Sequence, residues 1–149
     1  MALAANQIPI VANVIKSGVG VLTGTTIGTL GSNTNGVTIY TAGTKGGRVL
    51  SLMASTDDTV TINVFLYIYR GTTVVPIGLV NIPLSSGNTN AARFPVDFLN
   101  GTNLPGLPID NTGRQYIPLI ENDVLKATTL ANLSATKSAW LTAHCSDFQ

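Results

Sequence analysis

Apolar and polar positions alternate most clearly over residues 59–70. The even positions are all aliphatic and comprise Val60, Ile62, Val64, Leu66 and Ile68. The odd positions begin with threonine and asparagine and become aromatic at Phe65, Tyr67 and Tyr69. Because successive side chains of a strand point to opposite faces, the pattern predicts a β-strand with one aliphatic, core-facing row and a second row that ends in aromatic side chains.

A hairpin is predicted directly after this strand. Residues 71–72 supply a turn, and residues 73–84 form a second apolar segment that we expect to pair with the first. Pro76 and Pro83 interrupt this second segment. Since proline cannot donate a hydrogen bond to a neighbouring strand, we expect the segment to lie at a sheet edge or to contain a bulge.

Further short apolar segments bounded by turn residues predict the remaining strands. They are 37–40, 48–54, 123–129 and 137–144, with 19–22 and 116–120 as further candidates. Residues 85–115 form a long irregular section, and no segment has a convincing helical period. Seven or eight short strands with long connections are typical of an all-β, jelly-roll-like (Greek-key) β-sandwich, which we expect over residues 37–149.

Residues 1–36 are expected to form an extended N-terminal arm. Alanine, glycine, threonine and asparagine dominate there, and its six glycines break any helical period. We expect the arm to lie along another protein and to be disordered when free. On this interpretation, deletion of residues 1–30 leaves a folded domain.

Composition separates this chain from most enzymes and nucleic-acid-binding proteins. Charged residues make up 10% of the sequence and apolar residues 44%, with a formal net charge of +1. Globular domains carry about a quarter charged residues, so we expect the protein to bury much of its surface in an assembly. Lys16 is the only charged side chain among the first 44 residues. That arm is too weakly basic for phosphate neutralisation, and no nucleic-acid partner is expected.

Neither a secreted fold with disulfides nor a membrane span is predicted. Cys145 is the only cysteine, and no apolar run reaches the eighteen or so residues of a membrane helix. The first residues lack the basic region of a signal peptide. These features fit an intracellular folding compartment.

No constellation of residues predicts a catalytic, metal or cofactor site. His144 and Cys145 are adjacent, so in a strand they point to opposite faces and cannot form a catalytic pair. One histidine and one cysteine are too few for a zinc site, and nothing selects a pair of carboxylates for glycoside hydrolysis. Asp57 and Asp58 could join a calcium site, but a turn between strands explains them more simply. We therefore expect no enzyme.

Four aromatic side chains are candidate interface residues: Phe65, Tyr67, Tyr69 and Trp140. Two interpretations remain open for the row 65–69. It is either a second buried layer, packed under the long loop or the arm, or part of a subunit interface, where aromatic residues are enriched. Trp140 has the same two interpretations.

The segment 41–52, followed by Ser55-Thr56-Asp57-Asp58-Thr59 and the run 64–69, resembles head decoration (cement) proteins of tailed bacteriophages. The segments 123–129 and 140–144 are similar to the same family, and the resemblance covers residues 37–145. It implies a jelly-roll-related sandwich that binds the outer surface of the phage head and stabilises contacts between major capsid protein subunits. It also implies a homo-oligomer, commonly a dimer or trimer. A virion location follows, with synthesis in the bacterial host cytoplasm. The family offers no catalytic residues to transfer.

Two other functions remain open from sequence. The chain could be a tail, neck or adhesin component of a virion, which its position in the particle would reveal. It could instead be a carbohydrate-binding β-sandwich module that uses the row 65–69 as an exposed aromatic platform. Solvent exposure of Tyr67 and Tyr69 would favour that second alternative.

Overall fold

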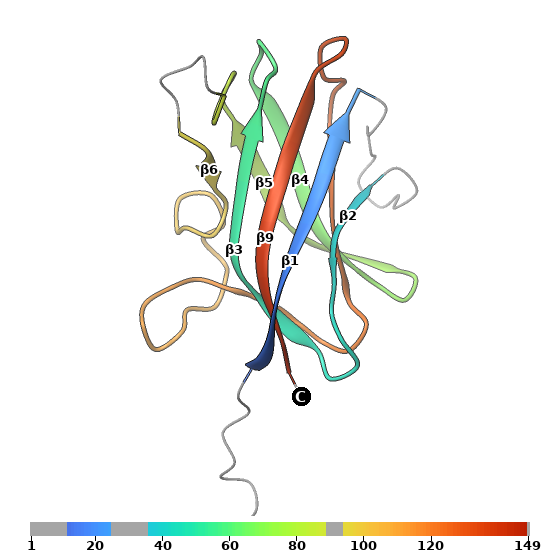
Figure 1. The fold of residues 1–149 in the computed structure, drawn as a ribbon, viewed down its shortest axis with the longest axis vertical. Coiled ribbons are helices and arrows are strands. Elements are labelled where there is room, and N and C mark those ends of the chain that lie inside the picture. Colours follow the sequence, from blue (N-terminus) through green and yellow to red (C-terminus); the bar gives the residue numbers. More distant parts are fainter. Residues whose placement is uncertain (1–11, 25–35, 89–93, 149) are drawn as a thin grey trace, which may run out of the picture.

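The computed structural model describes residues 12–24, 36–88 and 94–148. These residues form two antiparallel β-sheets packed face to face, without a helix among them (Figure 1). The strands are β1 Ala12–Thr23, β2 Val37–Thr41, β3 Gly47–Thr56, β4 Ile62–Arg70, β5 Thr73–Ile82, β6 Val96–Asp97, β7 Ile117–Leu119, β8 Val124–Thr129 and β9 Ser138–Phe148. The protein is an all-β sandwich, as predicted.

The order of strands in the two sheets is that of a jelly roll. The first sheet has the order β1-β9-β3-β6, with β7 also paired to β3, and the second sheet has the order β2-β8-β4-β5. The first four strands alternate between the sheets, which gives the long crossing connections of Greek-key folds. In Figure 1 the first sheet faces the viewer, and β9 lies between β1 and β3.

The predicted hairpin is present as β4 and β5. Gly71 turns the chain with φ +60°, and Arg70 pairs with Thr73. Strand β5 is the last strand of its sheet, and its register against β4 shifts near Pro76. Strand β5 therefore accommodates its proline in both of the expected ways, by lying at the sheet edge and by containing a bulge. The predicted start of the first strand is wrong: β4 begins at Ile62, and Val60 is 50% exposed.

The hydrophobic core lies between the sheets and is made from alternating positions of both. Val64 and Leu66 of β4 are fully buried, together with Leu125 of β8. Leu52 of β3 and Leu141 of β9 cover them from the first sheet and are also fully buried. The aliphatic row predicted from residues 62–68 is thus one wall of the core.

The N-terminal arm is the main correction to the sequence-based expectation. Residues 12–23 form β1, which pairs with β9 from Ala12 opposite Phe148 to Thr23 opposite Ser138. Leu22 of this strand is fully buried in the core. The sandwich therefore begins well before residue 37, while residues 1–11 and 25–35 of the expected arm lie outside the described residues.

Glycines at core-facing positions explain why the sequence predicts only residues 19–22 of β1 as a candidate strand. A Cβ atom on Gly18 would lie 2.1 Å from the Ile39 carbonyl oxygen of β2, and one on Gly20 would lie 3.0 Å from Ile39 Cγ1. The bare backbone of β1 therefore packs directly on β2 at this edge of the sandwich. Gly18 and Gly20, two of the glycines that suggested a disordered arm, are thus residues that let the two sheets pack closely here.

Candidate functional site

Strand β1 exposes its aliphatic side chains. Gly18, Gly20 and Leu22 face the core, so the alternate positions face outward. Ile15 is 80% exposed, Val19 58% and Val21 39%. This is the reverse of an ordinary half-buried strand, in which the branched aliphatic residues pack inside.

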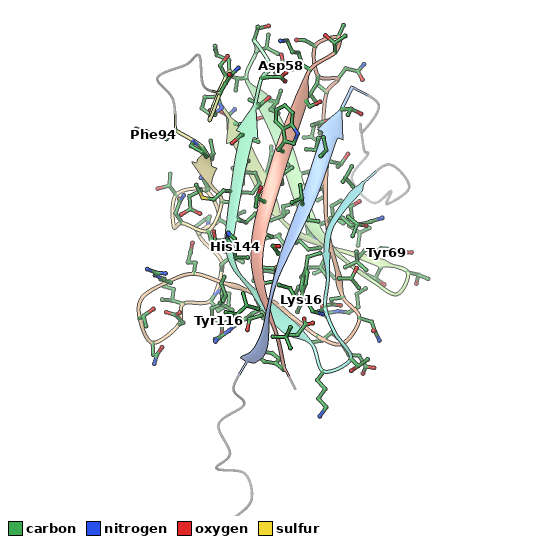
Figure 2. The ribbon with its side chains drawn as sticks, in the orientation of Figure 1. Lys16, Asp58, Tyr69, Phe94, Tyr116 and His144 are labelled. Carbon is green, nitrogen blue, oxygen red and sulfur yellow. The ribbon has the colours of Figure 1, made fainter. Side chains whose placement is uncertain are left out.

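The exposed row of β1 continues across the first sheet. Val21 lies beside Trp140 and then Ser55, Val19 beside Thr142 and then Met53, and Ser17 beside His144 and then Ser51. We call these nine residues and Ile15 the outer face. None of the ten is Asp, Glu, Lys or Arg, and Trp140 is 40% exposed. Figure 2 shows His144 in the middle of this face, with Asp58 and Lys16 toward opposite ends of the sandwich.

The aromatic row of β4 is buried within the chain. Phe65 and Tyr67 stack with their ring centroids 5.6 Å apart, and they are only 6% and 1% exposed. A Cβ atom on Gly36 would lie 1.8 Å from the Tyr67 hydroxyl oxygen, so the chain that enters β2 runs directly over this ring. Burial raises the pKa of Tyr67. Of the two interpretations, the buried layer is the one that describes Phe65 and Tyr67 in this chain.

The four predicted interface residues do not form one surface, because Trp140 lies apart from the other three. Tyr69 is half-buried on β4, with the Lys126 ammonium group 5.4 Å from its ring centroid. Trp140 lies on β9 in the other sheet and belongs to the outer face. Sequence reasoning missed the β1 residues of this face. The signal that could have found them is the strict alternation of glycine with valine over residues 18–21.

His144 and Cys145 lie on opposite faces of β9, as strand alternation predicts. His144 is exposed on the outer face, whereas Cys145 is fully buried in the core, and burial raises the pKa of its thiol to about 12. Within the described ranges, no group of three or more His, Cys, Asp or Glu side chains is placed to hold a metal ion. The same ranges contain no helix long and apolar enough to cross a membrane.

Of the hollows on the first sheet, two differ in size and in their distance from Trp140. The larger, of about 580 Å³, lies where β3 meets the long loop after β6 and is lined by Leu50, Asp97, Asn100 and Arg114, among others. The smaller, of about 230 Å³, lies beside Trp140 and is lined by Ser55, Thr56, Asp57, Gly87 and Asn88. The indole of Trp140 is thus the one member of the predicted set that borders a hollow with polar walls.

Comparison with known proteins identifies no family. No family model matches the chain, and no curated protein matches it. A solved structure of the carbohydrate-binding module CBM36 in complex with calcium and xylotriose is similar at 15% sequence identity, over 93% of this chain and 95% of that chain. Its TM-score of 0.34 is too low to relate the two proteins.

Proposed function

We propose that this protein is a structural component of a virion, a capsid decoration (cement) protein that binds major capsid protein subunits through the outer face. The observation that supports this is the outward row of Ile15, Val19 and Val21 on β1. Exposed apolar surface of this kind is typical of protein–protein contacts. Charged residues are depleted at the centre of such contacts, and the outer face has no Asp, Glu, Lys or Arg.

The position of β1 in its sheet adds a second support. Strand β1 is twelve residues long and stands at the end of the sheet, so among the described residues only β9 pairs with it. A long, apolar edge strand is a template on which a strand of another chain can form hydrogen bonds. A capsid subunit or a second copy of this chain is the partner proposed for that edge, in keeping with a dimer or trimer.

The two rival functions make different demands on the surface. A tail, neck or adhesin component would use the same outer face, and only its place in the particle distinguishes it. The carbohydrate-binding alternative, in the form that needs the row 65–69 as a platform, is not supported, because Phe65 and Tyr67 are buried.

Location in the particle tests the proposed function. An antibody against the recombinant chain, applied to phage particles from a lysate that contains this protein, is expected to label the whole head in electron micrographs. Label confined to the tail or neck would support the rival assignment. If the chain is abundant in the lysate but no particle is labelled, the virion assignment is wrong.

A further inference from the structure

The hollow beside Trp140 combines an aromatic surface with polar walls. Trp140 is 40% exposed, and its neighbours across the sheet are Val21 and Ser55. The turn after β3 and the loop after β5 complete the hollow with Asp57 and Asn88. It lies at the same end of the sandwich as Asp58 in Figure 2, away from Lys16 and the start of β1.

The walls of this hollow are held in place before any ligand arrives. The Asp57 carboxylate accepts a hydrogen bond of 2.8 Å from the Ser138 backbone N–H, which fixes its orientation. Gly87 has φ +73°, and a Cβ atom there would lie 2.3 Å from Ser55 Oγ, so only glycine lets this loop lie against β3. A site formed by fixed groups loses little conformational entropy on binding.

The charges around the hollow favour a neutral ligand. The ammonium group of Lys137 lies 4.0 Å from Asp57 Oδ2, so the one carboxylate of the hollow already has a cationic neighbour. The side chain of Asp57 is still 32% exposed, so a hydroxyl group of a ligand can donate a hydrogen bond to its carboxylate. The amide of Asn88 provides both donor and acceptor groups.

We propose that this hollow binds one pyranose ring of a neutral carbohydrate. The negative face of the indole ring attracts the weakly positive C–H groups on the apolar side of a sugar ring. Asp57 and Asn88 would bind its hydroxyl groups, in the usual arrangement of an apolar site with a few placed polar groups. The volume of about 230 Å³ is below the range of about 300–1,000 Å³ found for drug-sized ligands. It therefore suits a single ring, with the rest of the glycan outside.

This inference goes beyond the proposed function and does not depend on it. The hollow and the outer face share Trp140 and Ser55, but the hollow also needs Asp57 and Asn88 at the loop end of the sandwich, whereas the proposed contact with capsid subunits is centred on the aliphatic row of β1. A Val19→Asp variant is therefore expected to keep carbohydrate binding while it loses attachment to capsids. Failure of one proposal leaves the other standing.

Affinity electrophoresis of the full chain tests the site. Gels containing xylan, hydroxyethyl cellulose, glucomannan, galactan or soluble starch form the panel, and at least one is expected to retard the protein. Because Trp140 is the only tryptophan in the chain, an oligosaccharide of the retarding polymer should also give a saturable shift of tryptophan emission. If no polymer of the panel retards the protein, the proposal is overturned.

Two variants assign the effect to the indole. Trp140→Ala is expected to weaken binding about tenfold or more, in line with the loss of an aromatic contact and its buried area. Phe94→Ala is the matched control, because Phe94 is 90% exposed but does not line the hollow. Equal urea midpoints for both variants and the wild type establish that they are folded. Undiminished retardation of a folded Trp140→Ala variant would contradict the proposal.

Discussion

Asp58 fixes the turn between β3 and β4, and it does so as a fully buried carboxylate. Its Oδ1 accepts a hydrogen bond of 2.6 Å from Ser134 Oγ and one of 3.2 Å from the Val60 N–H, and its Oδ2 accepts one of 2.8 Å from the Ser134 N–H. Burial raises the pKa of Asp58, but these hydrogen bonds lower it more, and its pKa lies below the usual value. The acidic pair considered for calcium is thus a structural turn at this position.

Replacement of Asp58 by asparagine should destabilise the protein in a pH-dependent way. We expect Asp58→Asn to lower the free energy of unfolding by about 1–3 kcal/mol at neutral pH, because an amide nitrogen cannot accept these hydrogen bonds. Since the folded pKa is depressed, the wild-type advantage exists above the unfolded pKa and is lost as the pH falls through the folded pKa. Urea denaturation at pH 7 and near pH 3 measures the difference.

The titration of Asp123 does not affect the difference in free energy of unfolding between wild type and Asp58→Asn. Burial raises its pKa, but the Arg70 guanidinium, bound at 2.8 and 2.7 Å, and the Ile120 N–H lower it more. Asp123 is present in both variants, so its titration cancels in their difference. A gap between wild type and Asp58→Asn that stays constant down to acid pH would mean that the Asp58 charge is not what stabilises the turn.

Gly36 and Tyr67 form a contact that a double-mutant cycle can resolve. A Cβ atom on Gly36 would lie 1.8 Å from the Tyr67 hydroxyl oxygen and 2.8 Å from Cζ. We expect Gly36→Ala to cost about 1–3 kcal/mol through overpacking. Tyr67→Phe should be close to neutral, because this buried hydroxyl has no hydrogen-bond partner among the described residues.

The Gly36→Ala/Tyr67→Phe double variant is expected to recover part of the loss, since the closest atom is removed while the ring remains. Thermal denaturation of the four proteins gives the coupling free energy. Strict additivity would show that the chain entering β2 does not rest on this ring.

Among the elements, β1 gives the clearest test, because the sequence-based expectation and the structure disagree there. Deletion of residues 1–23 removes β1, uncovers the edge of β9 and takes Leu22 from the core. We expect that truncation to be unfolded or aggregated by circular dichroism and gel filtration. A well-folded 24–149 fragment would restore the interpretation of this segment as an arm.

The elements also show where sequence reasoning succeeds. The strand at 62–70 and its hairpin could be predicted because aliphatic residues occupy its core-facing positions and glycine follows it. Only residues 19–22 of β1 were predicted as a candidate strand, because the inward positions Gly18 and Gly20 carry no apolar side chain and their packing depends on β2. Likewise, Tyr67 is covered by the chain at Gly36, which is distant in sequence. Trp140 was named beside that row from the sequence, but its place in the other sheet is a property of the sheet order.

At the scale of the whole molecule, attachment to a larger assembly should depend on one face of the sandwich. On the proposed function, Val19→Asp is expected to abolish capsid decoration, because a charge would be desolvated at the centre of the contact. Leu79→Asp is the matched control: Leu79 is 49% exposed, but it lies on β5 of the other sheet. Sedimentation of capsids with bound protein measures both variants. Equal loss of binding in the two would show that the outer face is not the docking surface.

A final consequence follows from the place of β9 between β1 and β3. The strand nearest the C-terminus joins the two strands that come first and third along the chain, so the first sheet cannot assemble from any continuous half of the polypeptide. Pairings between such distant segments give a high contact order, which is associated with folding in milliseconds to seconds. Before β9 pairs with β1 and β3, the backbone groups along the facing edges of these two strands have no partner strand. During this interval the nascent chain is most exposed to aggregation.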